Sequence, residues 1–556
     1  MEDIRALFRV QTRNGPRNER PAGKKRLVVV GHGMVSHALC EELVERDTGS
    51  EYRITVIGEE PLPAYDRVRL TSYFETRDPS ALFLANPEEY ERRGIRLRLG
   101  TKVARIDRER RVVVTTANEM LPYDLLVLAT GSAPFVPPVP GMEKPGVFVY
   151  RTIADLDAIL EYSANAKSAA VVGGGLLGLE AAKAVKDLGL EAHIVEFASR
   201  LMPRQLDPSG ADVLLRKITE LDVTVHLGKT TARVHGEEKA RGLRFSDGTR
   251  LDVDMVIVSA GIRPRDELAR EAGLEIGERG GIVVDDLLRT SDGSVYAIGE
   301  CALHRGAIYG LVGPGYEMAR ALAEHLTTQK GSFTGADTST KLKLLGVDVA
   351  SIGDPFADAQ TGRAIVFQDL VRGVYKKMAL SGDGKRLLGA VLVGDATQYA
   401  ALLHASKSDA PLPSAPEELL LGARNGAGSG GAGLELPMSA QVCSCNNVSK
   451  EAICAAIRDK GVTTVPEIKK CTRATSGCGG CAPLVADILL GELKALGKAQ
   501  KPRLCEHFAY TRAELFQIVK VKNIRSFDAL IQSHGHGSGC EICKPTVASI
   551  LASIHN

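Results

Sequence analysis

The sequence predicts an α/β protein with two doubly wound folds, a small α+β domain and, after them, two small helical cysteine-cluster modules. Between residues 26 and 325, short β-branched runs alternate with amphipathic stretches, the pattern of parallel sheets covered by helices. The runs lie at 27–30, 54–57, 125–128, 169–172, 192–195 and 255–258. Two glycine-rich turns each follow such a run, and one cysteine pattern occurs twice near the C-terminus. The chain has 556 residues, enough for about three to five domains.

Composition and charge exclude several classes of function. The 70 Lys and Arg residues balance the 68 Asp and Glu residues, which argues against a nucleic-acid surface and a polybasic membrane anchor. No apolar run reaches the roughly 18–20 residues of a membrane span, and residues 1–25 lack the apolar core of a signal peptide. Seven of the 11 cysteines lie at metal-ligand spacing, unlike a disulfide framework. We therefore expect a cytoplasmic protein with neither nucleic acid nor membrane as partner.

The first doubly wound fold begins with a β-branched run that leads into Gly31-x-Gly33-x-x-Ser36. Turns without side chains let backbone N–H groups and the following helix N-terminus approach a pyrophosphate. Glu59 or Glu60 follows the next strand, where a carboxylate accepts ribose hydroxyls. The arrangement predicts a dinucleotide site, although a single glycine-rich turn is also common in ordinary loops.

A second glycine turn, Gly173-x-Gly175-x-x-Gly178, keeps all three glycines and is followed by a strand that ends at Glu196. A carboxylate at this position binds the 2′-hydroxyl of the ribose and repels a 2′-phosphate. The sequence therefore favours NADH over NADPH. The alternative interpretation is that Glu196 is a solvated strand end.

Three further segments accompany the two turns: Ala129-Thr130-Gly131 after a strand, Gly261-Ile-Arg-Pro264, and Tyr296-Ala-Ile-Gly299-Glu300. With the paired turns they resemble the FAD- and pyridine-nucleotide-dependent oxidoreductases of the ferredoxin-reductase type. The resemblance implies FAD on the first fold and NAD on the second. It also implies that the chain returns to the first fold near 261–264.

The same resemblance implies roles for single residues. Gly31 and Gly33 are expected to contact the FAD pyrophosphate and Glu59 its ribose. Glu300 is expected at the ribityl chain and Arg67 near the flavin. Ser72 stands where many relatives carry a lysine near the flavin, which puts that electrostatic role in doubt. The FAD set is Gly31, Gly33, Ser36, Glu59, Arg67, Thr130, Gly131, Gly299 and Glu300, and the NAD set is Gly173, Gly175, Gly178 and Glu196.

Relatives of this fold that reduce disulfides or peroxide place one or two cysteines beside the flavin. Residues 65–74 contain no cysteine. Cys40 and Cys301 are predicted to be buried packing residues. No catalytic side chain is therefore predicted, and electrons that leave the flavin are expected to pass to the cysteine modules.

Shifts in composition divide the chain into segments. The predicted parts are a mobile tail at 1–25, an FAD-binding domain at 26–140 and 262–330, an NAD-binding domain at 141–261, a small α+β interface domain at 336–405, a flexible linker at 406–440, and two cysteine modules at 441–495 and 500–556.

The first module offers Cys443-x-Cys445 and Cys478-x-x-Cys481. Two irons bridged by sulfide need four soft anionic ligands, two for each iron, and each close pair of thiolates suits one iron. The segment resembles the bacterioferritin-associated ferredoxin module, a small helical [2Fe–2S] binder. Zinc in a four-thiolate site is the alternative. Ser449 is predicted to cap the helix that follows the first pair.

The second module repeats this spacing as Cys505-x-His507 and Cys540-x-x-Cys543. The flanking residues repeat as well, which indicates duplication of one module. Three thiolates and one imidazole could hold zinc, or a [2Fe–2S] cluster whose potential is raised by the neutral imidazole. The alternative is a degenerate copy kept for packing or docking.

The order of domains resembles the large-subunit family of NAD(P)H-dependent assimilatory nitrite reductases, without the sirohaem domain of that family. The resemblance implies a relay from NADH through FAD and [2Fe–2S] to a sirohaem and [4Fe–4S] domain, in a longer or separate polypeptide. Alone, this chain is not expected to reduce nitrite. One alternative is the NADH-dehydrogenase electron-transfer subunit of a molybdenum nitrate reductase. Another is a redox-sensing or assembly protein. The terminal acceptor and the oligomeric state, a homodimer included, stay open.

Overall fold

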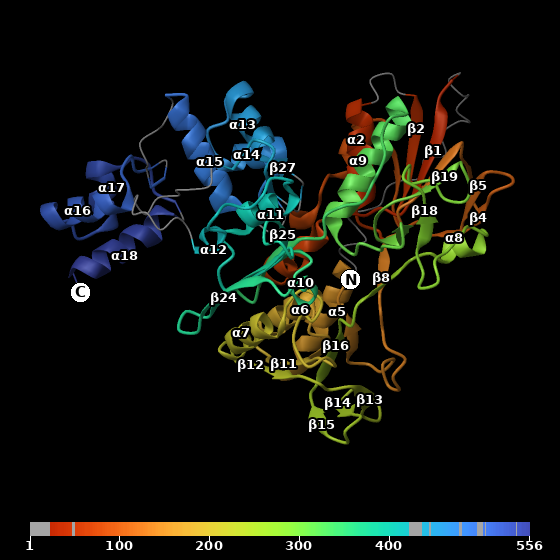
Figure 1. Cartoon of the computed structure of the whole chain (residues 1–556), viewed down its shortest axis with the longest axis horizontal. Helices are drawn as coiled ribbons and strands as arrows, with labels where there is room; N and C mark the ends of the chain where they lie inside the picture. Colours follow the sequence, from red (N-terminus) through yellow and green to blue (C-terminus); the bar gives the residue numbers. More distant parts are fainter. Residues whose placement is uncertain are drawn as a thin grey trace. The chain divides into compact units, whose positions relative to one another are not determined.

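The computed structural model describes residues 23–46, 51–421, 436–443, 446, 448–476, 481–497, 504–505, 507–540 and 542–555 (Figure 1). The chain forms two compact units. The first comprises Met1–Lys450 and Arg473–Cys481, and the second comprises Glu451–Thr472 and Ala482–Asn556. Within the described ranges, none of the helices combines the length and apolar character that crossing a membrane requires.

The first unit contains a five-stranded parallel sheet in the order β19-β7-β1-β2-β3. Its strands are β1 (Lys25–Val30), β2 (Tyr52–Ile57), β3 (Arg96–Arg98), β7 (Leu125–Leu128) and β19 (Val295–Ala297). Helices α2 (Met34–Arg46) and α9 (Val312–Thr328) pack side by side (Figure 1). Strand β1 ends in four buried apolar residues, because a parallel strand in the middle of a sheet has both faces covered.

A second five-stranded parallel sheet has the order β12-β11-β10-β16-β9. Its strands are β9 (Val147–Val149), β10 (Ser168–Val172), β11 (Glu191–Val195), β12 (Val223–His226) and β16 (Met255–Val258), and its helices are α5 (Ile153–Ser163), α6 (Leu176–Asp187) and α7 (Pro208–Thr219). The chain enters this fold through β8 (Ser132–Pro134) and returns through β17 (Ile262–Pro264), which pair antiparallel. The predicted α/β class with two doubly wound folds is confirmed.

Each doubly wound fold also carries an antiparallel three-stranded sheet. In the first fold it consists of β4 (Val103–Asp107), β5 (Val112–Thr115) and β6 (Met120–Pro122), and in the second of β13 (Thr231–His235), β14 (Gly242–Phe245) and β15 (Arg250–Asp252). Shorter elements connect the rest: α3 (Tyr73–Thr76), α4 (Pro87–Arg92), α8 (Glu267–Glu271), β18 (Ile282–Val284) and β20 (Ala302–His304).

A third, antiparallel sheet follows with the order β21-β22-β25-β24-β23. Its elements are β21 (Thr340–Leu344), β22 (Val347–Gly353), α10 (Asp358–Thr361), β23 (Ala364–Asp369), β24 (Val374–Leu380), β25 (Leu387–Val393) and α11 (Tyr399–Lys407). Helix α11 packs on β22 and β25. Tyr375 of β24 donates a hydrogen bond to Asp207, the N-cap of α7, at 2.6 Å. This buried contact ties the sheet to the second doubly wound fold.

The predicted flexible linker at 406–440 needs a correction in its first part. A short helix, α12 (Glu418–Leu421), places Leu419 and Leu420 in the hydrophobic core beneath α11. Burial of two leucines stabilises this segment by a few kcal/mol, which composition alone does not reveal. Residues 422–435 lie outside the described part of the chain.

The two cysteine modules show the same helical order. The first contains α13 (Lys450–Asp459), α14 (Val465–Thr472) and α15 (Ala482–Ala495), and the second contains α16 (Arg512–Lys522), α17 (Phe527–His534) and α18 (Cys543–His555). Short strands β26 (Gln441–Cys443) and β27 (Val448–Ser449) precede α13. Thr511, the counterpart of Ser449, caps α16 through a capping box with Glu514. The helical repeat therefore agrees with duplication of one module.

Candidate redox centre

The glycine turn after β1 is shaped for close approach. Gly31 has φ +103°, and a Cβ on it would lie 2.2 Å from the carbonyl oxygen of Ala129 at the end of β7. Gly33 faces open space, since nothing lies within 4 Å of an added Cβ. Ser36 donates its hydroxyl to the carbonyl of Gly33 at 3.1 Å. The turn is thus closed on the sheet side and open at the N-terminus of α2, as a pyrophosphate site requires.

His32, between the two glycines, is a residue that sequence reasoning missed. Both ring nitrogens are buried and have no hydrogen-bond partner among the described residues. Burial lowers the pKa of His32 to about 4, so the ring is neutral at pH 7. Buried polar groups are normally paired, and unpaired nitrogens beside the turn fit a site that a bound dinucleotide completes. The only signal in the sequence is a polar residue inside the glycine motif.

The two glutamates after β2 are engaged differently. Glu59 makes ion pairs with Lys102 at 3.0 Å and with Arg265 at 2.5 Å. Glu60 pairs with Arg67 and accepts a hydrogen bond from the Tyr65 hydroxyl at 2.7 Å. Glu59 is the more exposed of the two side chains and so has carboxylate surface left for a ribose. The contacts of Glu60 hold Arg67 in place.

A second carboxylate network lies where the two folds meet. Glu300 accepts hydrogen bonds from Arg151 at 2.5 Å and from the Ser132 hydroxyl at 2.6 Å. Arg67 donates to the carbonyl oxygen of Arg151 at 2.7 Å. Gly299, with φ +79°, would meet Val35 of α2 at 3.3 Å if it carried a Cβ. The structure therefore brings Arg67 and Glu300 together through Arg151, which sequence reasoning missed because nothing local marks it.

Thr130 and Gly131 occupy the same junction. The Thr130 hydroxyl donates to the carbonyl oxygen of Arg265 at 2.6 Å. Gly131 has φ +67° and nothing within 4 Å of an added Cβ. Both residues directly precede β8, so they lie at the point where the chain leaves the first fold.

The second glycine turn has the same design as the first. Gly173 has φ +123°, and its Cβ would lie 2.2 Å from the carbonyl oxygen of Ser259. Gly175 caps α6 and faces open space. Gly178 packs on the turn itself, because its Cβ would lie 1.9 Å from the carbonyl oxygen of Gly173. These contacts leave an open helix N-terminus for a second dinucleotide.

Glu196 is buried at this turn, with 4% of its surface exposed. Its carboxylate accepts the N–H of Gly174 at 2.6 Å and the N–H of Ala198 at 2.8 Å. The interpretation as a solvated strand end is therefore excluded. The next residue, Phe197, exposes 75% of its surface. Its exposure beside the turn was not foreseen from the sequence.

The cysteines of the first doubly wound fold do not form a redox pair. Cys40 and Cys301 expose 1% and 0% of their surface, as predicted for packing residues. Burial raises the pKa of Cys40 to about 12 and also raises the pKa of Cys301. Both thiols therefore stay protonated at neutral pH and are poor nucleophiles.

Two of the four predicted iron ligands are described, and they come together. Cys443 lies at the end of β26 and Cys481 directly before α15. A hydrogen bond from the Cys481 side chain is the largest cause that lowers the pKa of Cys443 to about 6. Asn446 Nδ2 lies 3.7 Å from Cys443 Sγ and donates to the carbonyl oxygen of Arg473. Metal binding needs thiolates, and this contact favours the thiolate form of Cys443.

Cys445 and Cys478, the other two predicted ligands of this cluster, lie outside the described residues. The loop that contains Arg473 and precedes Cys478 contacts the first doubly wound fold. Arg473, in the left-handed conformation with φ +63°, makes an ion pair with Glu41 of α2. This pair was not predicted, because the two residues are more than 400 positions apart in the chain.

The predicted second site also converges. Cys505, His507, Cys540 and Cys543 place their ligand atoms within 4.8 Å of one another. Burial increases toward Cys543, which is fully buried. The four groups are sufficient in number and chemistry to hold a metal ion.

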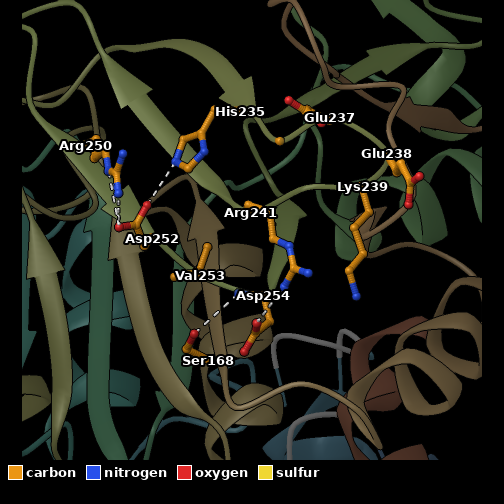
Figure 2. A pocket seen from close by; sticks show the side chains of 11 residues that line it. Ser168, His235, Glu237, Glu238, Lys239, Arg241, Arg250, Asp252, Val253 and Asp254 are labelled. Atoms are coloured by element: carbon orange, nitrogen blue, oxygen red, sulfur yellow. Dashed lines mark hydrogen bonds and ion pairs between the residues drawn. The ribbon is translucent and has the colours of Figure 1, made fainter.

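A hollow of about 710 Å³ lies on the β13–β15 sheet and its neighbours. Figure 2 shows that the side chains that line it carry charges of both signs. Arg250 pairs with Asp252 at 2.8 Å, and Arg241 lies 3.9 Å from Asp254. None of the residues that line the hollow belongs to the glycine turns or to the cysteine sets, so it is not part of the redox centre.

Comparisons with known families agree with this geometry. Residues 25–324 match the family described as pyridine nucleotide-disulphide oxidoreductase. Residues 339–410 match the rubredoxin NAD⁺ reductase C-terminal domain, and residues 441–490 match the BFD-like [2Fe-2S] binding domain. The matches to these families imply the predicted cofactors, which are FAD, a pyridine nucleotide and [2Fe–2S].

Curated relatives cover nearly the whole chain. The nitrite reductase [NAD(P)H] large subunit of Klebsiella oxytoca is 51% identical over 95% of this chain and 55% of that protein. The nitrite reductase (NADH) large subunit of Escherichia coli (strain K12) is 46% identical over 96% of this chain and 63% of its own length. The assimilatory nitrate reductase electron transfer subunit of Bacillus subtilis (strain 168) is 34% identical, with 96% and 68% covered. This chain thus spans between half and two thirds of the first two relatives.

Solved structures resemble about 70% of the chain. A NAD-dependent persulfide reductase from A. fulgidus has a TM-score of 0.64 and 26% identity, covering 69% of this chain and 76% of the other. A putidaredoxin reductase in covalent complex with putidaredoxin has a TM-score of 0.64 and 25% identity, covering 72% of this chain and 99% of the other.

Proposed function

Because the chain belongs to the pyridine nucleotide-disulphide oxidoreductase family, we propose that it is the electron-input part of an assimilatory nitrite reductase. In this role it takes electrons from NADH and passes them through FAD to the [2Fe–2S] cluster. One observation carries the proposal. A [2Fe–2S] domain follows a reductase in which Cys40 and Cys301, near the first nucleotide turn, are buried and protonated, so neither of these two thiols is available to take electrons from the flavin.

The proposed roles of the residues follow from their contacts. When bound, FAD takes two electrons as hydride from NADH and the [2Fe–2S] cluster accepts single electrons. Gly33 and Gly175 leave the space that lets the two pyrophosphates reach the helix N-termini. Glu196, held by two N–H groups, accepts the ribose hydroxyls of NADH.

The charged network around Glu300 positions the flavin side of the centre. Arg151 and Ser132 hold the Glu300 carboxylate, and Glu60 holds Arg67. These contacts fix both groups before a cofactor binds, so little ordering cost remains for binding. Near the cluster ligands, Asn446 orients Cys443. The ion pair between Arg473 and Glu41 joins the loop that precedes Cys478 to α2.

The acceptor in this proposal is a sirohaem and [4Fe–4S] domain in a longer or separate polypeptide. Support comes from the two nitrite reductase large subunits, which extend well beyond the length that this chain matches. We place the relay in the cytoplasm, where thiols stay reduced. A homodimer is compatible with this role.

A second candidate is the electron-transfer subunit of a nitrate reductase. It is favoured by the Bacillus subtilis relative of that name, of which this chain covers 68%, a larger share than of either nitrite reductase above. The lower identity of 34% against 51% favours the nitrite reductase role. Both candidates share the same relay and differ in the acceptor.

An anaerobic NADH titration of the full chain tests the relay. We expect the flavin absorbance to bleach and the EPR signal of a reduced [2Fe–2S] cluster to follow. Flavin bleaching without a cluster signal would contradict the relay and leave a sensing or assembly role. Purified sirohaem polypeptide and purified molybdenum subunit are then added separately. NADH-dependent loss of nitrite only in the first mixture is expected, and loss of nitrate in the second would support the nitrate reductase role.

A further inference from the structure

The second cysteine module has its own ligand set, outside the segment that matches the [2Fe-2S] domain. We propose that Cys505, His507, Cys540 and Cys543 bind a single Zn²⁺ ion in a closed tetrahedral site that stabilises this module. The inference goes beyond the electron relay and does not depend on it. The sequence leaves open whether this set binds zinc or a second iron–sulfur cluster, and the proposal selects zinc.

The distances between ligand atoms fit one ion. Cys540 Sγ and Cys543 Sγ lie 3.7 Å apart, and Cys505 Sγ lies 3.9 Å from His507 Nδ1. Zinc bonds of about 2.3 Å to sulfur and about 2.0 Å to nitrogen give tetrahedral edges of roughly 3.5–3.8 Å. Both observed separations lie within a few tenths of an ångström of these edges, so an ion needs only a small contraction of the set.

A two-iron cluster fits less well. Its two ligand pairs bind different irons and lie on opposite ends of the bridged core, so atoms of one pair are far from those of the other. Here all four ligand atoms lie within 4.8 Å of one another. The two pairs therefore point at one centre. Three thiolates and one imidazole are a common structural set for zinc, and no coordination position is left open for chemistry.

The loop that brings the second pair is built to approach the ligands. A Cβ on Gly537, which has φ +73°, would lie 3.0 Å from His507 Cδ2. A Cβ on Gly539, which has φ +80°, would lie 3.3 Å from Cys543 Sγ. The N–H of Cys540 points at Cys543 Sγ at 3.1 Å. Backbone N–H groups directed at sulfur are typical support for a bound thiolate.

The small size of the module suggests that a bound ion would stabilise its fold. Its core consists of Phe508, Leu515, Val519, Leu530, Ile531, Cys543, Val547 and Ile550. So small a core rarely stabilises about 50 residues alone, and natural mini-domains add a metal or disulfides. Cys543 belongs both to the core and to the ligand set. An ion would thus link the first turn of α18 to Cys505 and His507, which precede α16.

Metal analysis of the full chain is the first test. We expect one zinc and two irons per chain, and zinc X-ray absorption with sulfur at about 2.3 Å and nitrogen at about 2.0 Å. Four irons without zinc, with two distinguishable cluster signals in EPR, would overturn the proposal. Two irons and no zinc, in protein made with ample zinc, would overturn it equally.

Substitutions of single residues test which side chains bind the zinc ion. We expect His507→Ala and Cys540→Ser to lose the zinc and to keep both irons and the NADH-dependent bleaching of flavin. His536→Ala is the matched control, since His536 lies in the same loop with its ring centre 6.2 Å from that of His507 but outside the ligand set. His507→Cys, which restores the residue type of the first module, should retain one zinc. Zinc that persists in both His507→Ala and Cys540→Ser would place the ion elsewhere and refute the site, even if a variant folds poorly.

Discussion

The carboxylate of Glu196 accepts the N–H of Gly174 at 2.6 Å, which ties the end of β11 to the glycine turn that opens α6. The corresponding carboxylate of the first fold, Glu59, instead forms ion pairs with Lys102 and Arg265. One nucleotide turn therefore holds its acidic residue by backbone N–H groups and the other by basic side chains. This difference leads to a prediction about coenzyme choice.

Replacing Glu196 by Gln should weaken the preference for NADH over NADPH. A neutral amide no longer repels a 2′-phosphate, and its NH₂ group opposes one of the two backbone N–H groups that now bind the carboxylate. We expect the ratio of kcat/KM for NADH and NADPH to shift by about tenfold or more, equivalent to about 1.4 kcal/mol. Glu191→Gln, at the exposed start of the same strand, is the control. An unchanged ratio in the Glu196 variant would contradict the proposed contact.

Replacing Gly33 by Ala should remove FAD without unfolding the protein. The added methyl group meets no protein atom within 4 Å, but it fills the space through which a pyrophosphate reaches the N–H groups. We expect the Kd for FAD to rise by about tenfold or more, equivalent to about 1.4 kcal/mol of lost binding, and the FAD content per chain, measured by absorbance after gel filtration, to fall. Gly293→Ala, also in open space, should keep its FAD. Full occupancy in the Gly33 variant would argue against this turn as the pyrophosphate site.

Replacing Cys443 or Cys481 by Ser should abolish electron transfer to the cluster and leave the reduction of the flavin by NADH intact. Loss of one thiolate leaves one iron with only one of its two protein ligands. We expect both irons of the cluster to be lost while NADH still bleaches the flavin and ferricyanide is still reduced. Cys471→Ser, at an exposed cysteine outside the set, should behave as the wild type. Retention of a cluster signal in both ligand variants would show that the ligands lie elsewhere.

Reversing the charge of Arg473 should slow electron transfer to the cluster. Glu at this position repels Glu41 of α2 in place of the present ion pair. An exposed ion pair is worth about 0.2–1 kcal/mol and breaking a buried one costs about 3–5 kcal/mol. This pair is half-buried and lies between the two, so we expect cluster reduction in stopped-flow experiments to slow by at least about fivefold, with flavin reduction unchanged. The double variant Arg473→Glu, Glu41→Lys should recover part of the rate. Glu45→Lys, exposed on the same helix, is the control, and an equal loss there would indicate a nonspecific charge effect.

Replacing Lys377 by Met should destabilise the contact between the antiparallel sheet and the second doubly wound fold. Lys377 is 5% exposed and lies 2.8 Å from Asp358 and 3.5 Å from Asp207. Its loss leaves two carboxylates without their cation, which costs about 3–5 kcal/mol. Urea unfolding should show the change, whereas Lys385→Met, at an exposed position, should not. Equal urea midpoints for the Lys377 and Lys385 variants would contradict the predicted loss of stability.

The sequence alone was sufficient for features that depend on local geometry. Gly31, Gly173 and Gly178 stand where a side chain would collide with backbone atoms, so the glycine spacing predicts the turns and, through them, the doubly wound folds. The sequence also predicted that the thiols of Cys40 and Cys301 are buried and that the helical module is duplicated. Apolar periodicity and repeats can be recognised from neighbouring positions in the sequence.

Only the tertiary structure decided which distant groups meet. The pairs Arg151 with Glu300 and Arg473 with Glu41 join residues far apart in the chain, and Leu419 and Leu420 are buried although their segment has the composition of a linker. Such contacts depend on the order of strands and on how the connections return, and no short-range pattern encodes that order. The sequence therefore determined the chemistry that is available, and folding determined which groups act on one another.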